Sequence, residues 1–88
     1  MGWEIRVSET ADRQLARLGY QDEKRILKFL RERLETCDNP RDFGDPLSGN
    51  FSGLWRYRVG DYRLICDIQD ERILVLVLKI GHRREVYR

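Results

Sequence analysis

Six consecutive apolar residues, Ile73 to Leu78, constrain the fold of this chain more than any other feature. A strand with one face in water alternates apolar and polar side chains, so this uninterrupted run predicts a central strand covered on both faces. The run is far shorter than the ~20 apolar residues that a membrane-spanning helix needs. We therefore expect a sheet built around residues 73–78 and no transmembrane segment.

Two strands and a tight turn are predicted just before this run. Residues 54–59 and 62–68 form strand-like segments, and the Gly60-Asp61 pair between them is typical of a two-residue hairpin turn. Residues 69–72 form a second turn. Near the start of the chain, residues 3–7 alternate apolar and polar side chains, which predicts one further, half-buried strand.

Two amphipathic helices are predicted between the first strand and the hairpin. Ser8 is a suitable N-cap for a short helix, and Gly19 stands where a C′ glycine is expected. The apolar stripe of this helix consists of Ala11, Leu15 and Leu18. A second helix is expected from about Gln21 to Cys37, with a stripe of Ile26, Leu27, Leu30, Leu34 and Cys37. Its basic residues lie outside that stripe, on a face that either is solvated or contacts phosphates.

The remaining segment, Asp38 to Gly53, is rich in Gly, Pro, Asn, Asp and Ser, which predicts a loop. We expect its Phe43, Leu47 and Phe51 to attach it to the core. The chain is then one domain over residues 1–88 with the order β-α-α-β-β-β. This order predicts an α+β fold, with two helices packed on one face of a small, mostly antiparallel four-stranded sheet.

Pairing across the hairpin turn brings three arginines onto one face of the sheet. The two-residue turn places Arg58 directly opposite Arg63, and Arg56 follows on the same face. Like charges in opposed positions destabilise a hairpin, so these arginines need a partner. The partner is either an acidic neighbour such as Asp67 on the same face or a bound polyanion. The opposite face is expected to meet the helices through Tyr57, Leu64, Cys66 and Ile68.

The last ten residues add further positive charge. Lys79, Arg83, Arg84 and Arg88 stand against one acid, an excess of three positive charges on a chain with a formal net charge of +2. We expect the chain to turn at Gly81, so that Arg83 and Tyr87 reach back over the sheet. Guanidinium groups match phosphate geometry, and a tyrosine beside them can stack on an unpaired base. These residues fit a site for single-stranded RNA, whereas Tyr87 alone would also fit simple packing on the sheet.

Other chemistries lack the residues that they need. One histidine and two separated cysteines give no metal-ligand spacing, and no glycine-rich phosphate loop is present. We therefore expect neither a metal nor another cofactor, and an inert buried thiol at Cys66. The N-terminus lacks the apolar stretch of a signal peptide, which favours a cytoplasmic protein.

Three stretches of the sequence resemble the RelE toxins of bacterial and archaeal toxin–antitoxin systems. They are Pro-Leu-Ser-Gly at 46–49, Leu-Trp-Arg-Tyr-Arg-Val-Gly-Asp-Tyr-Arg-Leu at 54–64 and Gly-His-Arg-Arg-Glu-Val-Tyr at 81–87. The resemblance covers nearly the whole chain and implies a toxin that enters the ribosomal A site and cleaves mRNA there. It also implies a RelB-like antitoxin as partner, contact with operator DNA only through the antitoxin complex, and no membrane association. We expect no C-terminal helix of the kind that some relatives carry.

The resemblance also implies roles for individual residues. Arg56 and Arg58 match basic residues of the active-site strand, and Arg63 matches a phosphate-binding arginine. Arg83 matches the arginine that stabilises charge on the leaving 5′ oxygen. Tyr87 matches the tyrosine that stacks on or orients the substrate nucleotide. The implied reaction is attack of a 2′-hydroxyl on the adjacent phosphate by a metal-independent endoribonuclease. The basic residues Lys79, Arg84 and Arg88 are expected to contribute to RNA binding.

One departure from the family leaves the proton acceptor open. Relatives often have lysines where this chain has Arg56 and Arg58, and arginine does not lose its proton in proteins. His82 and Tyr87 are the candidates for this role, although His82 would also serve to stabilise the turn. Two other functions fit the same fold: a ParE-like poison of DNA gyrase, or a catalytically decayed member that only binds its antitoxin.

Overall fold

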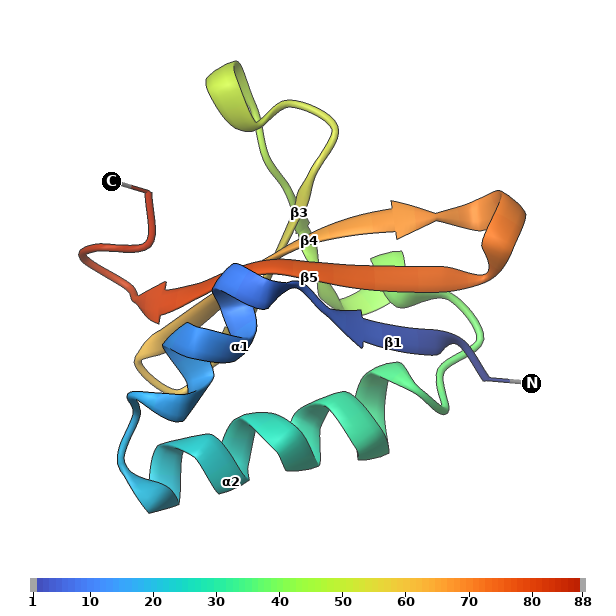
Figure 1. The fold of residues 1–88 in the computed structure, drawn as a ribbon. Helices are drawn as coiled ribbons and strands as arrows, with labels where there is room; N and C mark the ends of the chain where they lie inside the picture. The colour runs from blue at the N-terminus through green and yellow to red at the C-terminus, as the bar shows by residue number, and fades with distance from the viewer. Residues whose placement is uncertain (1, 88) are drawn as a thin grey trace.

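The computed structural model describes residues 2–87, which form a five-stranded sheet with two helices packed on one face (Figure 1). The elements are β1 (Glu4–Val7), α1 (Glu9–Ala16), α2 (Tyr20–Phe29), β2 (Asp45–Pro46), β3 (Trp55–Val59), β4 (Tyr62–Gln69) and β5 (Leu74–His82). The sheet order is β1-β5-β4-β3-β2, with β1 parallel to β5 and the other pairs antiparallel. The predicted α+β class is confirmed. The predicted number of four strands is wrong, because Asp45 and Pro46 pair with β3.

The apolar run forms an interior strand of the sheet, as predicted. β5 lies between β1 and β4, and its Leu74, Val75 and Val77 are buried. The prediction that both of its faces are covered is only partly right, because the helices cover one face of the sheet and Leu76 and Leu78 are half-buried (Figure 1). Ile73 lies outside the strand, with a left-handed backbone (φ 51°) and a side chain that is 53% exposed. It ends the 3₁₀ turn Asp70–Arg72 that joins β4 to β5, and this turn confirms the predicted one.

Each of the two helices begins directly after its N-cap residue, Ser8 for α1 and Gly19 for α2. The Ser8 hydroxyl accepts a hydrogen bond from the backbone N–H of Ala11 at 3.1 Å, which confirms the predicted N-cap. Gly19 is not a C′ residue, because its backbone is extended (φ −65°, ψ 158°) and it is the N-cap of α2. α2 continues into a π-helical turn, Leu30–Leu34, so the helical segment ends before Cys37.

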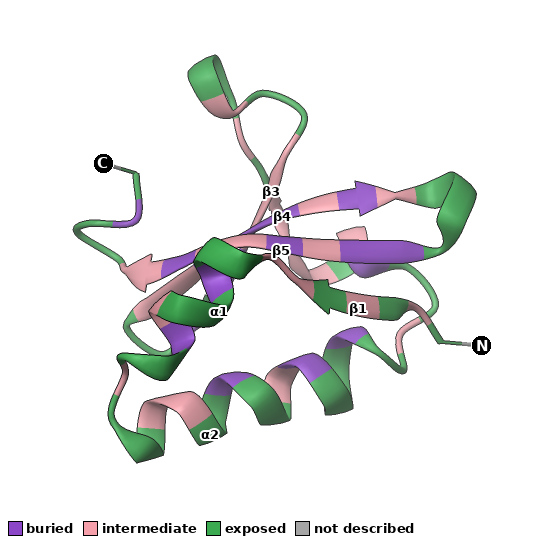
Figure 2. Cartoon of the chain, viewed as in Figure 1, coloured by how far each residue is buried: buried purple, intermediate pink, exposed green. Residues whose placement is uncertain are grey.

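The core lies between the helices and the sheet, as the buried residues in Figure 2 show. Ile26, Leu30 and Leu34 are buried there, at the spacing of four that keeps side chains on one helix face. Leu27 was predicted to share this stripe but is 36% exposed, because it lies one residue, about 100°, away from Ile26. Cys37 is half-buried beyond the helical segment.

The burial of Leu34 and the exposure of Leu27 give a prediction about stability. Leu34→Ala leaves a cavity in the core, so we expect the free energy of unfolding to fall by about 2–5 kcal/mol. Leu27→Ala removes the same atoms from the surface and should cost less than about 1 kcal/mol. Urea unfolding of both variants checks the expectation. Equal losses would contradict the placement of the two leucines.

The segment from 38 to 53 contains two short 3₁₀ turns, Pro40–Phe43 and Gly49–Phe51. Phe43 attaches the first turn to the core, since its ring lies 5.5 Å from that of Tyr57, and the Tyr57 hydroxyl donates to the carbonyl of Pro40. The other two expected anchors are wrong. Leu47 is half-buried outside the core, and Phe51 lies on a loop that rises from the sheet away from the helices (Figure 1).

No helix among residues 2–87 is both long enough and apolar enough to cross a bilayer.

Candidate active site

Three arginines share the face of the β3–β4 hairpin that points away from the helices. Arg58 lies directly opposite Arg63, and Arg56 lies opposite Ile65, in the register that the two-residue turn predicts. Tyr57 and Leu64, on the opposite face, are fully buried. The predicted division of the hairpin into two faces is confirmed, and we call the face that carries Arg56, Arg58 and Arg63 the arginine face.

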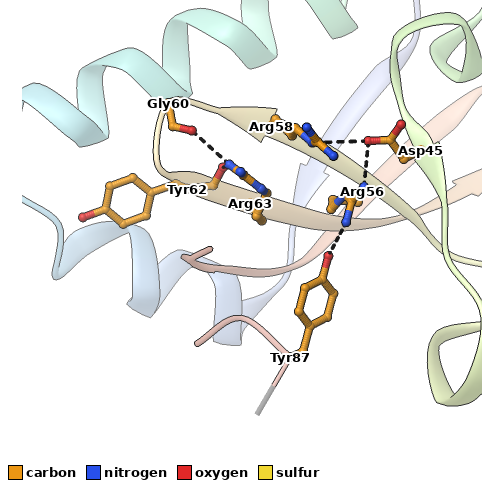
Figure 3. Close-up of polar contacts among 7 residues, drawn as sticks. All are labelled: Asp45, Arg56, Arg58, Gly60, Tyr62, Arg63 and Tyr87. Atoms are coloured by element: carbon orange, nitrogen blue, oxygen red, sulfur yellow. Dashed lines mark hydrogen bonds and ion pairs between the residues drawn. The ribbon is translucent and has the colours of Figure 1, made fainter. Parts of the chain in front are cut away.

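An aspartate from β2 lies between two of these arginines. The Asp45 Oδ2 atom accepts a hydrogen bond from Arg56 Nη2 at 3.0 Å and lies 3.6 Å from Arg58 Nε (Figure 3). Asp67, the acid expected in this role, instead accepts a hydrogen bond from Gln69 at 3.0 Å. One carboxylate among three guanidiniums leaves the arginine face with net positive charge, so it still suits an anionic ligand.

Tyr87 reaches back to the arginine face from the end of the chain. Its hydroxyl accepts a hydrogen bond from Arg56 Nη1 at 3.1 Å (Figure 3). Its ring meets that of Phe51 edge-on at 5.6 Å. The pKa of Arg56 is raised above its ordinary value, mainly by the hydrogen bond with Tyr87 and next by the hydrogen bond with Asp45. The tyrosine both packs on the sheet and remains 40% exposed, so part of its ring is open to a ligand.

Arg56 is therefore the centre of the site. One nitrogen of its guanidinium contacts Tyr87 and another contacts Asp45, which joins the C-terminal segment to β2. Its Nε atom is buried, and within residues 2–87 it has no hydrogen-bond partner. A guanidinium with a donor still unused can take up a further acceptor after a small rotation.

Arg63 and Arg83 both contact the β3–β4 turn, Arg63 through its side chain and Arg83 through its backbone. Arg63 Nη1 donates to the carbonyls of Gly60 and Tyr62, both at 2.9 Å (Figure 3). The backbone N–H of Arg83 donates to the carbonyl of Asp61 at 2.8 Å, which holds the residues after β5 beside the same turn. The Arg83 side chain is exposed, and within residues 2–87 its guanidinium forms no hydrogen bond or ion pair. It is thus available to a ligand beside the β3–β4 turn, where the backbone of Arg83 is held.

Gly81 acts by close packing rather than by turning the chain. It lies inside β5, and a Cβ at this position would be 3.2 Å from the Cα of Val86 and 3.3 Å from its Cβ. Val86 is fully buried and anchors the C-terminal segment that carries Tyr87. The glycine therefore allows this segment to fold back against the sheet.

His82 lies on the other face of the sheet. It pairs with Tyr62, and the two rings meet edge-on at 6.0 Å. They lie beside a hollow that is also lined by Gln14 of α1 and by Arg17 and Leu18, which follow that helix. Its Nδ1 accepts the backbone N–H of Arg84 at 3.3 Å. The structure thus separates His82 from the arginine face and gives it contacts within the chain reversal after β5.

The remaining predicted RNA-binding residues differ in their positions. Lys79 pairs with Ile65, which places it on the arginine face, where it is half-buried. Arg84 is exposed in the turn that follows β5, and Arg88 lies outside the described residues. The structure therefore groups Lys79 with the arginine face and leaves Arg84 at its margin.

Metal ligands and thiols are two other kinds of group that could carry chemistry in this chain. Among residues 2–87, no three His, Cys, Asp or Glu side chains gather in a way that could hold a metal ion. Cys66 is a free thiol that is fully buried, and burial raises its pKa, which keeps it in the unreactive protonated form.

Comparisons with known proteins agree on one class of protein. Residues 5–87 match the family model described as the ParE toxin of the type II toxin–antitoxin system parDE. Toxin RelG of Mycobacterium tuberculosis is 32% identical over 88 residues, covering 100% of this chain and 99% of the relative. Toxin RelE of the same organism is 31% identical over 86 residues, covering 98% of this chain and 87% of the relative.

Solved structures show the same likeness. A chain of the M. tuberculosis toxin–antitoxin complex RelBE2 is similar with a TM-score of 0.86 and 29% identity, covering 97% of this chain and 95% of that one. A chain of the archaeal RelE–RelB complex from Pyrococcus horikoshii is similar with a TM-score of 0.76 and 28% identity, covering 98% and 100%.

Proposed function

The chain belongs to the ParE toxin family of type II toxin–antitoxin systems, and from this premise we propose that it is a RelE-like endoribonuclease that cuts mRNA in the ribosomal A site. It is a toxin of the RelE/ParE superfamily, and relatives named RelG and RelE favour the RelE branch. The observation that carries the proposal is Arg56, hydrogen-bonded to Tyr87 on an exposed face that Arg58 and Arg63 share.

The chemistry of RNA cleavage suits such a site. The 2′-hydroxyl next to the scissile phosphate is a built-in nucleophile, so the protein mainly has to orient it and stabilise charge. Arg58 and Arg63 hold the phosphate, Tyr87 stacks on a neighbouring base, and Arg83 stabilises the leaving 5′ oxygen. The products are a 2′,3′-cyclic phosphate and a free 5′-hydroxyl.

A partner follows from the same premise. Several similar structures are complexes of RelE with RelB, so we infer that this toxin is held inactive by a RelB-like antitoxin. The antitoxin binds through an amphipathic segment that folds on the toxin surface, and operator DNA is contacted through the complex. The toxin acts in the cytoplasm, where ribosomes translate mRNA.

Expression in bacterial cells separates this function from gyrase poisoning, which the ParE family model keeps as a second candidate. Radiolabelled methionine incorporation should fall within minutes of induction, without gyrase-linked DNA breaks, and co-expression of the antitoxin should restore it. DNA breaks that precede the fall in translation would assign the chain to gyrase. Normal growth with a folded toxin would indicate a decayed member.

The close packing at Gly81 gives a prediction about activity. Gly81→Ala forces the segment around Val86 outward, which moves Arg83 and Tyr87 away from the arginine face. We expect mRNA cleavage to slow by up to about 10-fold, because Val86 must give by only a few tenths of an ångström, less than the ~1 Å misplacement that costs about 100-fold. Single-turnover cleavage assays check the rate. Gly19→Ala is the control, because no atom lies within 4 Å of a Cβ built there.

A further inference from the structure

The reaction needs a proton acceptor, and the residues expected for this role do not provide one. The 2′-hydroxyl must lose its proton as it attacks phosphorus, but the guanidiniums of Arg56 and Arg58 stay protonated. His82 lies on the opposite face of the sheet. The hydroxyl of Tyr87 accepts a hydrogen bond from Arg56 but carries a proton of its own, which it would have to lose before it could take another. We propose that Asp45 is the general base of this toxin, an inference that rests on the proposed ribonuclease function.

Asp45 lies between two of the guanidiniums of the arginine face. It is paired with Arg56 in the sheet register, and its Oδ2 atom is held at 3.0 Å by Arg56 and at 3.6 Å by Arg58. Its side chain is 48% exposed, and within residues 2–87 its Oδ1 atom forms no hydrogen bond. One carboxylate oxygen therefore fixes the orientation of the group, while the other is open to a ligand on the arginine face.

The backbone fixes the position of this carboxylate. Asp45 lies in the two-residue strand β2, whose other residue, Pro46, pairs with Trp55. The backbone N–H of Leu47 donates to the carbonyl of Leu54 at 3.0 Å, which extends the attachment of this segment to β3. A catalytic base must be held within hydrogen-bond reach of the proton that it removes, and attachment to a sheet provides this.

Asp45 could instead be a counter-ion that only balances the charge of the arginines. This role explains less of the geometry than the role of general base does. The Arg58 and Asp45 side chains are 62% and 48% exposed, and exposed ion pairs contribute little to stability. Within residues 2–87 the terminal nitrogens of Arg58 form no hydrogen bond, so they can bind a phosphate beside Asp45. Since the 2′-oxygen is covalently close to the scissile phosphate, a phosphate bound there brings the 2′-hydroxyl within reach of the carboxylate.

The step is balanced in protons and bonds. The Asp45 carboxylate takes the proton of the 2′-hydroxyl, the bond from O2′ to phosphorus forms, and the bond from phosphorus to O5′ breaks. The leaving O5′, stabilised by Arg83, takes a proton from water, and Asp45 returns its proton to solvent. The RNA is cut into a 2′,3′-cyclic phosphate and a 5′-hydroxyl with no net uptake or release of protons.

Asp45→Asn tests the proposal, because asparagine keeps an oxygen that accepts the Arg56 hydrogen bond but cannot take the proton. We expect single-turnover cleavage of ribosome-bound mRNA to slow by about 100-fold or more, the usual contribution of a general base. Binding to ribosomes, measured by co-sedimentation, should not change. Asp67→Asn is the matched control, because it removes the same charge from a residue that is bonded to Gln69. It should cleave at the wild-type rate.

A second variant separates a proton acceptor from a group that only orients arginines. Asp45→Ala should be inactive and should regain cleavage with rising formate concentration, because formate supplies a free carboxylate. Wild-type rates in Asp45→Asn, or an Asp45→Ala variant that formate does not rescue, would overturn the proposal. In either case an active wild-type toxin leaves the ribonuclease function standing. An inactive wild-type chain would instead overturn the function and the inference together.

Discussion

Replacing Arg83 with alanine should lower the rate of ribosome-dependent mRNA cleavage by about 100-fold or more, the usual cost of removing a donor that stabilises transition-state charge. The guanidinium is exposed and forms no hydrogen bond or ion pair within residues 2–87, so its loss leaves no structural contact broken. The bond from its backbone N–H to Asp61 survives the substitution. The free energy of unfolding should therefore change by less than about 0.5 kcal/mol.

Two measurements check this expectation. Single-turnover cleavage assays give the rate, and urea unfolding with antitoxin binding shows that the fold and the partner surface are intact. Arg72→Ala is the matched control, since it removes the same charge from the exposed turn at the other end of β5. A wild-type rate in Arg83→Ala would remove this residue from the mechanism.

Arg56→Ala should have an effect at least as large. The substitution deprives Tyr87 of its hydrogen-bond donor and Asp45 of its nearer cation, so two other residues lose their positions. Groups that act as a unit give strongly non-additive effects. We therefore expect the double variant Arg56→Ala/Tyr87→Phe to be no slower than Arg56→Ala alone, because the hydroxyl of Tyr87 acts through Arg56.

A double-mutant cycle on the cleavage rate measures this coupling. Arg56→Lys is a useful second variant. It keeps the positive charge but lacks the planar guanidinium that donates to Tyr87 and Asp45 from two different nitrogens. It should recover part of the lost rate. Strictly additive effects of Arg56→Ala and Tyr87→Phe would show that Tyr87 works independently of Arg56.

The parts of the site that depend on local alternation could be predicted from the sequence. A two-residue turn fixes the register of its hairpin, so the pairing of Arg58 with Arg63 and the position of Arg56 followed directly. The continuous apolar run likewise identified β5 as an interior strand. Both features depend on neighbours in the chain rather than on distant contacts.

Asp45 could not be predicted in this way. It lies in a segment rich in Gly, Pro and Asp, and its strand is only two residues long, which is too short to show any alternation. Its pairing with Arg56 arises from the path of the loop, which depends on contacts such as Phe43 with Tyr57. The exposure of Leu27 could have been predicted, because helix geometry alone places it about 100° away from Ile26.

His82 is a different case, because the sequence held the information. It was grouped with Arg83 as its neighbour, but successive residues of a strand point to opposite faces. Counting by two from the buried Ile80 places His82 on the helix-bearing face, where it meets Tyr62. Extending β5 through Gly81 to His82 would have shown this.

The most direct test of the proposed function is primer extension on a reporter mRNA in a reconstituted translation mixture, with and without ribosomes. We expect cuts only when ribosomes are present, at positions that lie in the A site, with a 2′,3′-cyclic phosphate on the upstream fragment. Cuts of equal rate on free mRNA would contradict the ribosome-dependent function. An intact mRNA in the presence of ribosomes and folded toxin would contradict the ribonuclease function itself.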